Sequence, residues 1–194
     1  MGKGTGDLYI KCFSSDRIIF SKTYGIEDYT KKYVLDSSTR YTNNSSGYGS
    51  TVIANGVYSG GASFLSETFD GSQGDWTVKM DIMFTAGGCG VGVQYGVSHY
   101  RERSIFKINA GGGVGYNNSP NGWHGIGGFS LSYNVWYPVT FEKKGNTITC
   151  YCNDLNFSTS AWEFTNSPTL SVGTDQWSGS GSPVSFRNLR ILLL

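Results

Sequence analysis

Charged residues are scarce in this chain of 194 residues, and neither sign dominates. Asp, Glu, Lys and Arg make up 15% of the sequence, and the formal net charge is +1. Proteins that bind nucleic acid or anionic membranes by electrostatic attraction need a clustered excess of positive charge. Short basic groups, such as Lys143 with Lys144, fit solvated strand ends or turns equally well. We therefore expect no nucleic-acid partner.

Long hydrophobic runs and a recognisable export signal are also missing. No apolar stretch approaches the roughly 18 residues that a membrane-spanning helix needs, and the final ILLL suffices only for a terminal strand. We therefore expect no insertion into a membrane. The first residues, MGKGTG, lack the apolar core of a secretory signal. The sequence predicts export or assembly by another route, or a module of a longer protein.

Amphipathic helices are the third absence. No segment of ten or more residues has a convincing helical period, whereas short runs rich in β-branched and aromatic residues recur between groups of Gly, Asn, Asp, Ser or Pro. The 28 glycines are many, but glycine and proline together stay well below the roughly 25–30% of disordered chains. This pattern predicts an all-β fold, a sandwich or barrel of antiparallel hairpins.

The length predicts a single domain, since all-β sandwiches often reach about 200 residues as one unit. Residues 1–15 contain one alternating segment that ends in a Ser-Ser-Asp loop. We expect these residues to be a leader or the end of a preceding module. Residues 16–194 are then the sandwich itself.

The segment DWTVKMDIMF predicts a strand with a strongly defined register. Its alternation places Trp76, Val78, Met80, Ile82 and Phe84 on one face. Burying each such side chain contributes on the order of 1.5–3 kcal/mol before entropy is counted. A slip by one residue would expose the whole set, so we expect this face to lie in the core.

Cys150 and Cys152 lie one residue apart in NTITCYC, on the same face as Ile148, so we expect both to point inward. Same-face neighbours on a strand are roughly 6.5–7 Å apart, at or beyond the reach of a disulfide. No finger-like spacing links them to other metal ligands. We expect buried free thiols, which suit an anaerobic or reducing setting. The alternatives are a disulfide from one of them to Cys12 or Cys89, and a metal site.

Three stretches resemble the sandwich modules of the concanavalin A-like and laminin-G-like type. They are WYPVTFEKKGNTITCYCND, a strand opened by Trp, a turn and a second strand; SPVSFRNLRILLL, similar to a last strand; and GDWTVKMDIMFTAGGCGVGV, similar to paired middle strands. Together they cover most of residues 50–194. The resemblance implies a jelly roll of two curved antiparallel sheets with the first and last strands adjacent. The overall sequence pattern is most similar to that of modules in adhesin-like surface proteins of methanogenic archaea and in tail or fibre proteins of their viruses.

The resemblance also shows what this chain lacks. Glycoside hydrolases on this fold carry Glu-x-Asp-x-Glu on one strand, because the nucleophile and the acid must lie about 5 Å apart. Here Asp81 stands alone between Lys79 and Met83, so we expect no enzyme. Legume-type relatives bind calcium through loop Asp and Asn residues, but this chain has only scattered candidates, such as Asp154, Asp175, and Asp70 with Asp75, and no carboxylate-dense loop. We expect no cofactor, with calcium as the alternative.

Two glycine-rich segments contain the candidate ligand-binding residues. YNNSPNGWHGIGG and GTDQWSGSGS are predicted to be loops that expose aromatic and amide side chains. Sugars stack on aromatic rings, while amides and carboxylates hold their hydroxyl groups. The candidates are Tyr116, Asn118, Asn121, Trp123, His124, Asp175, Gln176 and Trp177. The alternative is that the two tryptophans fold inward and cap the ends of the sandwich.

These features favour a non-catalytic recognition module of an extracellular, cell-surface or virion protein, which binds a glycan or a host-surface polymer. The alternative is a structural spacer or oligomerisation module of a fibre or tail protein, for which a homo-oligomer is expected. A third hypothesis is a polysaccharide-active enzyme that uses Asp81 or a histidine. All three rest on the analogy of fold and on composition.

Overall fold

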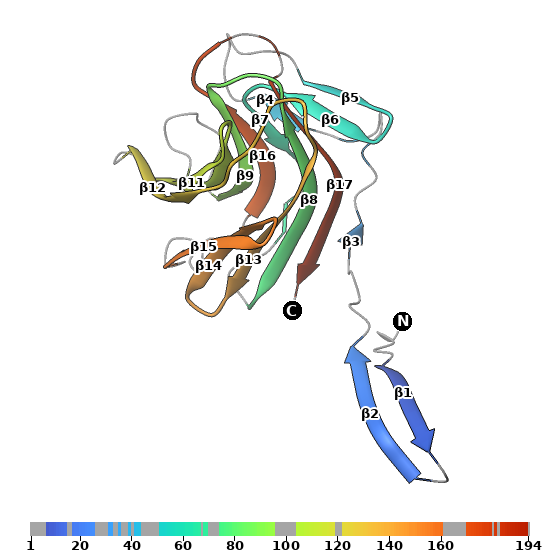
Figure 1. Cartoon of the computed structure of the whole chain (residues 1–194). Coiled ribbons are helices and arrows are strands. Elements are labelled where there is room, and N and C mark those ends of the chain that lie inside the picture. Colours follow the sequence, from blue (N-terminus) through green and yellow to red (C-terminus); the bar gives the residue numbers. More distant parts are fainter. Residues whose placement is uncertain are drawn as a thin grey trace.

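The computed structural model describes residues 7–14, 17–25, 31–32, 35, 39, 41–43, 51–66, 68–69, 74–95, 104–118, 122–160, 170–179, 181 and 183–193, with the backbone alone for residues 7–32. All regular elements in these ranges are β-strands (Figure 1). None of the described residues forms a helix that could span a membrane. The predicted all-β fold is confirmed.

Seven strands form one antiparallel sheet. They are β4 (Tyr41–Asn43), β7 (Ser63–Leu65), β9 (Cys89–Tyr95), β10 (Ser104–Asn109), β11 (Gly113–Asn118), β12 (Gly122–Gly128) and β16 (Leu170–Gln176). Their spatial order is β12-β11-β10-β9-β16-β7-β4. Strand β9 therefore lies between β10, its neighbour in sequence, and β16, which comes much later in the chain.

The second sheet has eight strands. They are β3 (Lys31–Lys32), β5 (Val52–Ala54), β6 (Val57–Gly60), β8 (Trp76–Phe84), β13 (Tyr137–Lys144), β14 (Thr147–Cys152), β15 (Leu155–Ser160) and β17 (Val184–Leu193). Their order is β15-β14-β13-β8-β17-β6-β5, and β3 also pairs with β17. The last strand thus lies beside strands from the beginning of the chain, as the resemblance implies. Strands β8 and β17 bend, with the seven-stranded sheet on the inside of the bend (Figure 1).

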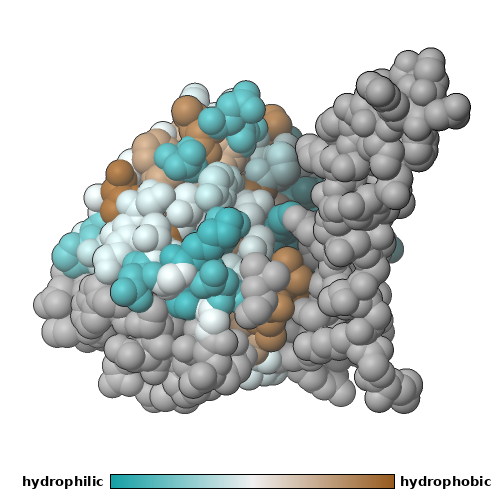
Figure 2. Space-filling model, turned by 90° about the horizontal axis from the view of Figure 1, so that it is seen from below, coloured by the Kyte–Doolittle hydropathy of each residue, from teal (hydrophilic) through white to brown (hydrophobic). Residues whose placement is uncertain are grey.

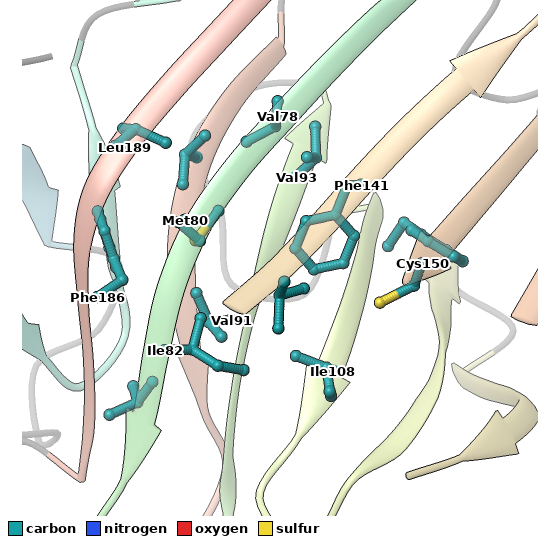
Figure 3. Close-up of a cluster of buried hydrophobic side chains, with 14 of the residues drawn as sticks. Val78, Met80, Ile82, Val91, Val93, Ile108, Phe141, Cys150, Phe186 and Leu189 are labelled. Carbon is teal, nitrogen blue, oxygen red and sulfur yellow. The ribbon is translucent and has the colours of Figure 1, made fainter. Parts of the chain in front are cut away.

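The core lies between the two sheets. Val78, Met80 and Ile82 of β8 face Val91 and Val93 of β9 across the sandwich, and none is more than 3% exposed (Figure 3). Trp76 and Phe84 at the ends of β8 are buried as well. The predicted face of this strand is therefore confirmed. The buried face of β8 follows from the two-residue period of a strand that has one side in the core.

The cysteines of β14 belong to this core. Ile148, Cys150 and Cys152 are at most 1% exposed, whereas Tyr151 between the two cysteines points outward and is 36% exposed. Cys89, Cys150 and Cys152 are free thiols. The expectation of buried free thiols is confirmed for these three, and the side chain of Cys12 lies outside the described residues.

Strands β1 (Asp7–Ser14) and β2 (Arg17–Gly25) form a separate two-stranded sheet. In Figure 1 this hairpin projects away from the sandwich. Strands β1 and β2 pair with each other across the predicted division between residues 15 and 16, and that division stays a prediction. A two-stranded ribbon is at best marginally stable in water when nothing covers it.

Candidate ligand-binding site

The outer face of the seven-stranded sheet, which points away from the core, is lined with glycine. Val91 and Val93 of β9 face the core, so Gly90 and Gly92 lie on the outer face. In the neighbouring strands, Gly115 pairs with Lys107 and Gly173 pairs with Gly92. Glycine has no side chain, so long side chains from adjacent positions can lie flat on the sheet there.

Lys107 uses this space to cross strand β9. It lies on β10 with Gly92 opposite on one side and Gly115 on the other, while Asp175 lies on β16 opposite Gly90. The strands β10 and β16 are two spacings, or roughly 10 Å, apart. A Cβ at Gly90 would be 3.0 Å from Cδ of Lys107, so the lysine stem runs over that glycine. The Nζ atom reaches the carboxylate of Asp175 and forms an ion pair.

Two tryptophan rings lie over the same ammonium group. The Nζ atom of Lys107 is 4.4 Å from the ring centroid of Trp177 and 5.3 Å from that of Trp123. Trp177 directly follows β16, and its backbone N–H donates a hydrogen bond of 2.9 Å to the carbonyl of Gly88. Trp123 comes from β12, and a Cβ at Gly115 would be 2.9 Å from its ring. Each tryptophan is 41% exposed.

We call Lys107, Asp175, Trp123 and Trp177 the tryptophan–lysine cluster. The side chain of Lys107 is 3% exposed and that of Asp175 is 12% exposed. The cluster therefore presents two half-exposed aromatic rings and a small part of the side chain of Asp175, while the side chain of Lys107 is enclosed. Attraction of a cation to aromatic faces is strongest when water is excluded, as it is here.

Two neutral amides flank the cluster. Gln94 is buried on the outer face of β9, opposite Ser171. A Cβ at Gly90 would be 2.8 Å from Oδ1 of Asn109. Nε2 of Gln94 and Oδ1 of Asn109 have no hydrogen-bond partner among the described residues. An unpaired buried donor or acceptor costs about 1–3 kcal/mol, so such atoms are uncommon in folded proteins.

The structure brings together only some of the predicted site residues. Trp123, Asp175 and Trp177 meet in the cluster, and neither tryptophan folds into the core. Tyr116 and His124 lie in β11 and β12, which are strands where a loop was predicted. They are cross-strand partners and stack on each other, with centroids 4.9 Å apart, on the opposite face of the sheet from Trp123. Alternation along β12 separates His124 from its neighbour Trp123.

Three further predicted residues do not contribute to the described cluster. Gln176 is fully buried, and its Nε2 donates a hydrogen bond of 3.2 Å to the carbonyl of Ser178. The prediction that it is exposed is therefore wrong, since it is on the core side of β16. The side chain of Asn118 and the whole of Asn121 lie outside the described residues.

Sequence reasoning missed Lys107. Its signal is the strand SIFKIN, in which Phe106 and Ile108 are buried in the core and a single lysine alternates with them. Lysine is rarely buried unless it is paired. A lysine in an otherwise apolar strand therefore indicates a nearby acid, but only the strand order reveals that this acid is Asp175.

Asp81, the residue of the hydrolase hypothesis, lies on the outer face of the other sheet. Its Oδ2 accepts hydrogen bonds from Nε of Arg187, at 3.2 Å, and from Nδ2 of Asn188, at 2.7 Å. Asn188 has a φ of 54° and lies where the register of β17 shifts against β8. The carboxylate therefore holds this bulge in place. Arg187 in turn lies over the ring of Trp136, 4.2 Å from its centroid.

The calcium candidates are spread over separate parts of the molecule. Asp175 is paired with Lys107, and Oδ1 of Asp75 accepts a hydrogen bond from the backbone of Gly145. Asp154 lies in the turn between β14 and β15. Within the described ranges, no three His, Cys, Asp or Glu side chains come together as metal ligands.

Several solved structures have a similar fold. The carbohydrate esterase of the Shiga toxin-encoding bacteriophage phi24B matches with a TM-score of 0.56 and 14% identity, over 84% of this chain and 96% of the other. Domain 4 of AbnA, an extracellular arabinanase of Geobacillus stearothermophilus solved with arabinotriose, matches with a TM-score of 0.54 and 14% identity, over 82% and 86%. A candidate glycosyl hydrolase of Parabacteroides distasonis matches with 0.51 and 14%, over 79% and 88%.

The fold is an antiparallel two-sheet β-sandwich. The sequence itself matches no protein-family model and no curated protein. At 14% identity the structural matches show the shared fold alone. The function of this sandwich therefore has to be argued from its own cluster.

Proposed function

We propose that this sandwich is a non-catalytic recognition module that binds a glycan at the tryptophan–lysine cluster. The observation that carries the proposal is the pair of half-exposed indole rings over one buried ammonium group, on a glycine-lined sheet face. The apolar face of a sugar ring packs against an indole ring. A small number of fixed polar groups beside such rings sets the orientation of a ligand, and Asp175 is placed to accept hydrogen bonds from hydroxyl groups.

Two of the structural neighbours support a carbohydrate ligand. One neighbouring domain was solved with arabinotriose, and the other belongs to a carbohydrate esterase. Both have TM-scores above 0.5, but they share 14% identity with this chain. They support the choice of a glycan over other ligand classes, and the cluster supports its position.

The cluster also favours binding over catalysis. Glycoside hydrolysis of the usual kind needs two carboxyl groups on either side of the bond that is cut. The cluster has one carboxylate, and that carboxylate is paired with Lys107. Asp81 is on the other sheet and is held by Arg187 and Asn188. This arrangement supports a module that binds its ligand without catalysing a reaction.

We further propose that the module belongs to an extracellular, cell-surface or virion protein and acts in adhesion or receptor binding to a host-surface polymer. The likeness of the sequence to modules of archaeal adhesin-like proteins and of viral tail fibres supports this setting. Three buried free thiols suit hosts that live without oxygen.

Replacing both tryptophans tests the proposed site. We expect Trp123→Ala together with Trp177→Ala to lower the affinity for a glycan selected from an array at least about a hundredfold, since stacked aromatic rings are typical binding hot spots. Isothermal titration calorimetry measures the loss. The matched control is Tyr151→Ala, which removes a ring with similar exposure, 36%, from the outer face of the other sheet. Equal affinity of the double variant and the control would place the binding site elsewhere.

A structural spacer or oligomerisation module is the second candidate function. It is favoured by the β1–β2 hairpin, which pairs with no other described strand. On the described surface seen in Figure 2, hydrophobic residues form small separate patches among hydrophilic ones, so that face offers no broad apolar interface. Light scattering of the full chain distinguishes the two candidates. A stable trimer without glycan affinity would favour the spacer.

A further inference from the structure

We infer that the glycan bound at the tryptophan–lysine cluster is uncharged, and that the site rejects uronic acids and sulfated sugars. This inference rests on the proposed function and adds the chemical class of the ligand. It follows from the charge balance of the cluster, from the unequal exposure of its two charged groups, and from the neutrality of the surrounding sheet.

The charge of the cluster is balanced before any ligand arrives. The ammonium of Lys107 is paired with the carboxylate of Asp175 and lies over two indole rings. The face of an aromatic ring is the negative side of its quadrupole. The cation is therefore surrounded by three electron-rich groups, and no positive potential remains to attract an anionic sugar.

The exposed member of the ion pair is the acid. The side chain of Asp175 is 12% exposed, whereas that of Lys107 is 3% exposed. A ligand that approaches over the two indole rings therefore meets more of the side chain of Asp175, which ends in carboxylate oxygen, than of the side chain of Lys107. Hydroxyl groups of a neutral sugar can donate hydrogen bonds to this oxygen. The carboxylate or sulfate of an acidic sugar would face a like charge in a site with little water, where repulsion is strong.

The rest of the sheet is neutral as well. Apart from His124, Lys107 and Asp175 are the only acidic or basic residues in the seven strands. The buried amides of Gln94 and Asn109, which lie on the same face, are uncharged as well. The described strands thus contain no second cation that could bind an acidic sugar.

A glycan array that carries matched neutral and acidic sugars tests the inference. The probes are pairs that differ only at the charged group, such as mannohexaose beside hexameric oligomannuronate, and neutral galactans beside their sulfated forms. We expect the neutral member of a bound pair to bind at least about tenfold more tightly. Its affinity should change less than about twofold between 0.1 M and 1 M salt, although the Debye length falls from about 10 Å to 3 Å.

The outcomes separate the inference from the proposed function. Equal or tighter binding of the acidic member, or an affinity that falls steeply with salt, overturns the inference and leaves glycan binding in place. No binding of either member of any pair overturns the proposed function, and the inference with it.

The variant Asp175→Asn gives an independent test. Removing the negative charge leaves the ammonium of Lys107 unbalanced, so we expect the preference to move at least about tenfold toward the acidic member of a pair. Asp154→Asn, in an exposed turn of the other sheet, is the matched control and should leave the preference unchanged. A folded Asp175→Asn protein with the original preference would overturn the inference. Where this variant does not fold, the comparison of matched sugars with the unmodified protein decides.

Discussion

Lys107 shows how one residue depends on its neighbours in space. A buried ammonium without a partner would be costly, and this one is paired with a carboxylate that is 68 positions away in the sequence. Its stem lies flat on the sheet because the residues opposite it on both neighbouring strands are glycines. A larger residue at either position would lift the lysine off the sheet. The position of the Lys107 ammonium therefore depends on Gly92 and Gly115.

Cys89 gives a prediction for the pH dependence of stability. Burial, followed by the nearby negative charge of Asp175, raises the pKa of this thiol from 9.0 to about 12. The folded state thus keeps the proton when the unfolded chain loses it. The contribution to stability is complete below pH 9 and is lost as the pH rises from 9 toward 12. At pH 10 we expect the native protein to have lost on the order of 1 kcal/mol through this group.

Urea unfolding at pH 7 and at pH 10, followed by tryptophan fluorescence, measures this loss. The control is Cys89→Ala, which lacks the thiol and should lose correspondingly less free energy of unfolding between the two pH values. Other buried groups, such as Cys150, also have raised pKa values and contribute to the loss in both proteins. An identical loss in the two proteins would show that the Cys89 thiol is not protected by burial.

At the scale of elements, β9 is the strand that makes the site possible. Its core face carries Cys89, Val91 and Val93, which are fully buried, and its outer face carries Gly90 and Gly92. Glycine weakens a strand interior through backbone entropy, so its use here has a local reason. That reason is the close approach of strand β10 and of the Lys107 stem.

Gly92→Ala tests the role of this strand. A Cβ there would collide with the carbonyl oxygen of Phe106 and with the backbone of Lys107. We expect the free energy of unfolding to fall by about 3 kcal/mol, as for other overpacked sites. The matched control is Gly128→Ala on the edge strand β12, where the nearest atoms would be 3.6 Å away. Thermal unfolding compares the two, and a Gly92→Ala protein as stable as the control would contradict this reading of β9.

At the scale of the whole molecule, charge is divided between the sheets. The seven-stranded sheet carries one ion pair, whereas the eight-stranded sheet carries many charged residues, including Lys79, Asp81, Glu142, Arg187 and Arg190. One outer face is thus neutral and lined with glycine, and the other is charged and solvated. This difference supports the proposed placement of the glycan on the first face.

The β1–β2 hairpin belongs to this scale as well. Because it pairs with none of the described strands of the sandwich, removing residues 1–25 should change the melting temperature by no more than about 2 °C. Calorimetry and the glycan titration on the shortened chain measure stability and binding together. A fall of more than several degrees, or lost glycan affinity, would show that the hairpin is part of the sandwich core or of the site.

The sequence predicted more of the fold than of the site. The buried faces of β8 and β14 could be predicted from the alternation of apolar and polar residues, because a strand with one side exposed to solvent has a period of two residues. The segment from Tyr116 to Gly128 was predicted to be a loop, because its glycine and asparagine content is that of a turn. In the structure its four glycines belong to β12, where Gly127 makes room for the ring of Phe157. Composition does not distinguish these two uses of glycine.

What the sequence by itself determined is the class of fold and the core faces of β8 and β14, since these follow from local periodicity. What only the tertiary structure decided is the meeting of Lys107, Asp175, Trp123 and Trp177. They come from three strands, β10, β12 and β16, and from the residue that follows β16. The order of strands within a sheet depends on the packing of the whole chain, and no local pattern records it.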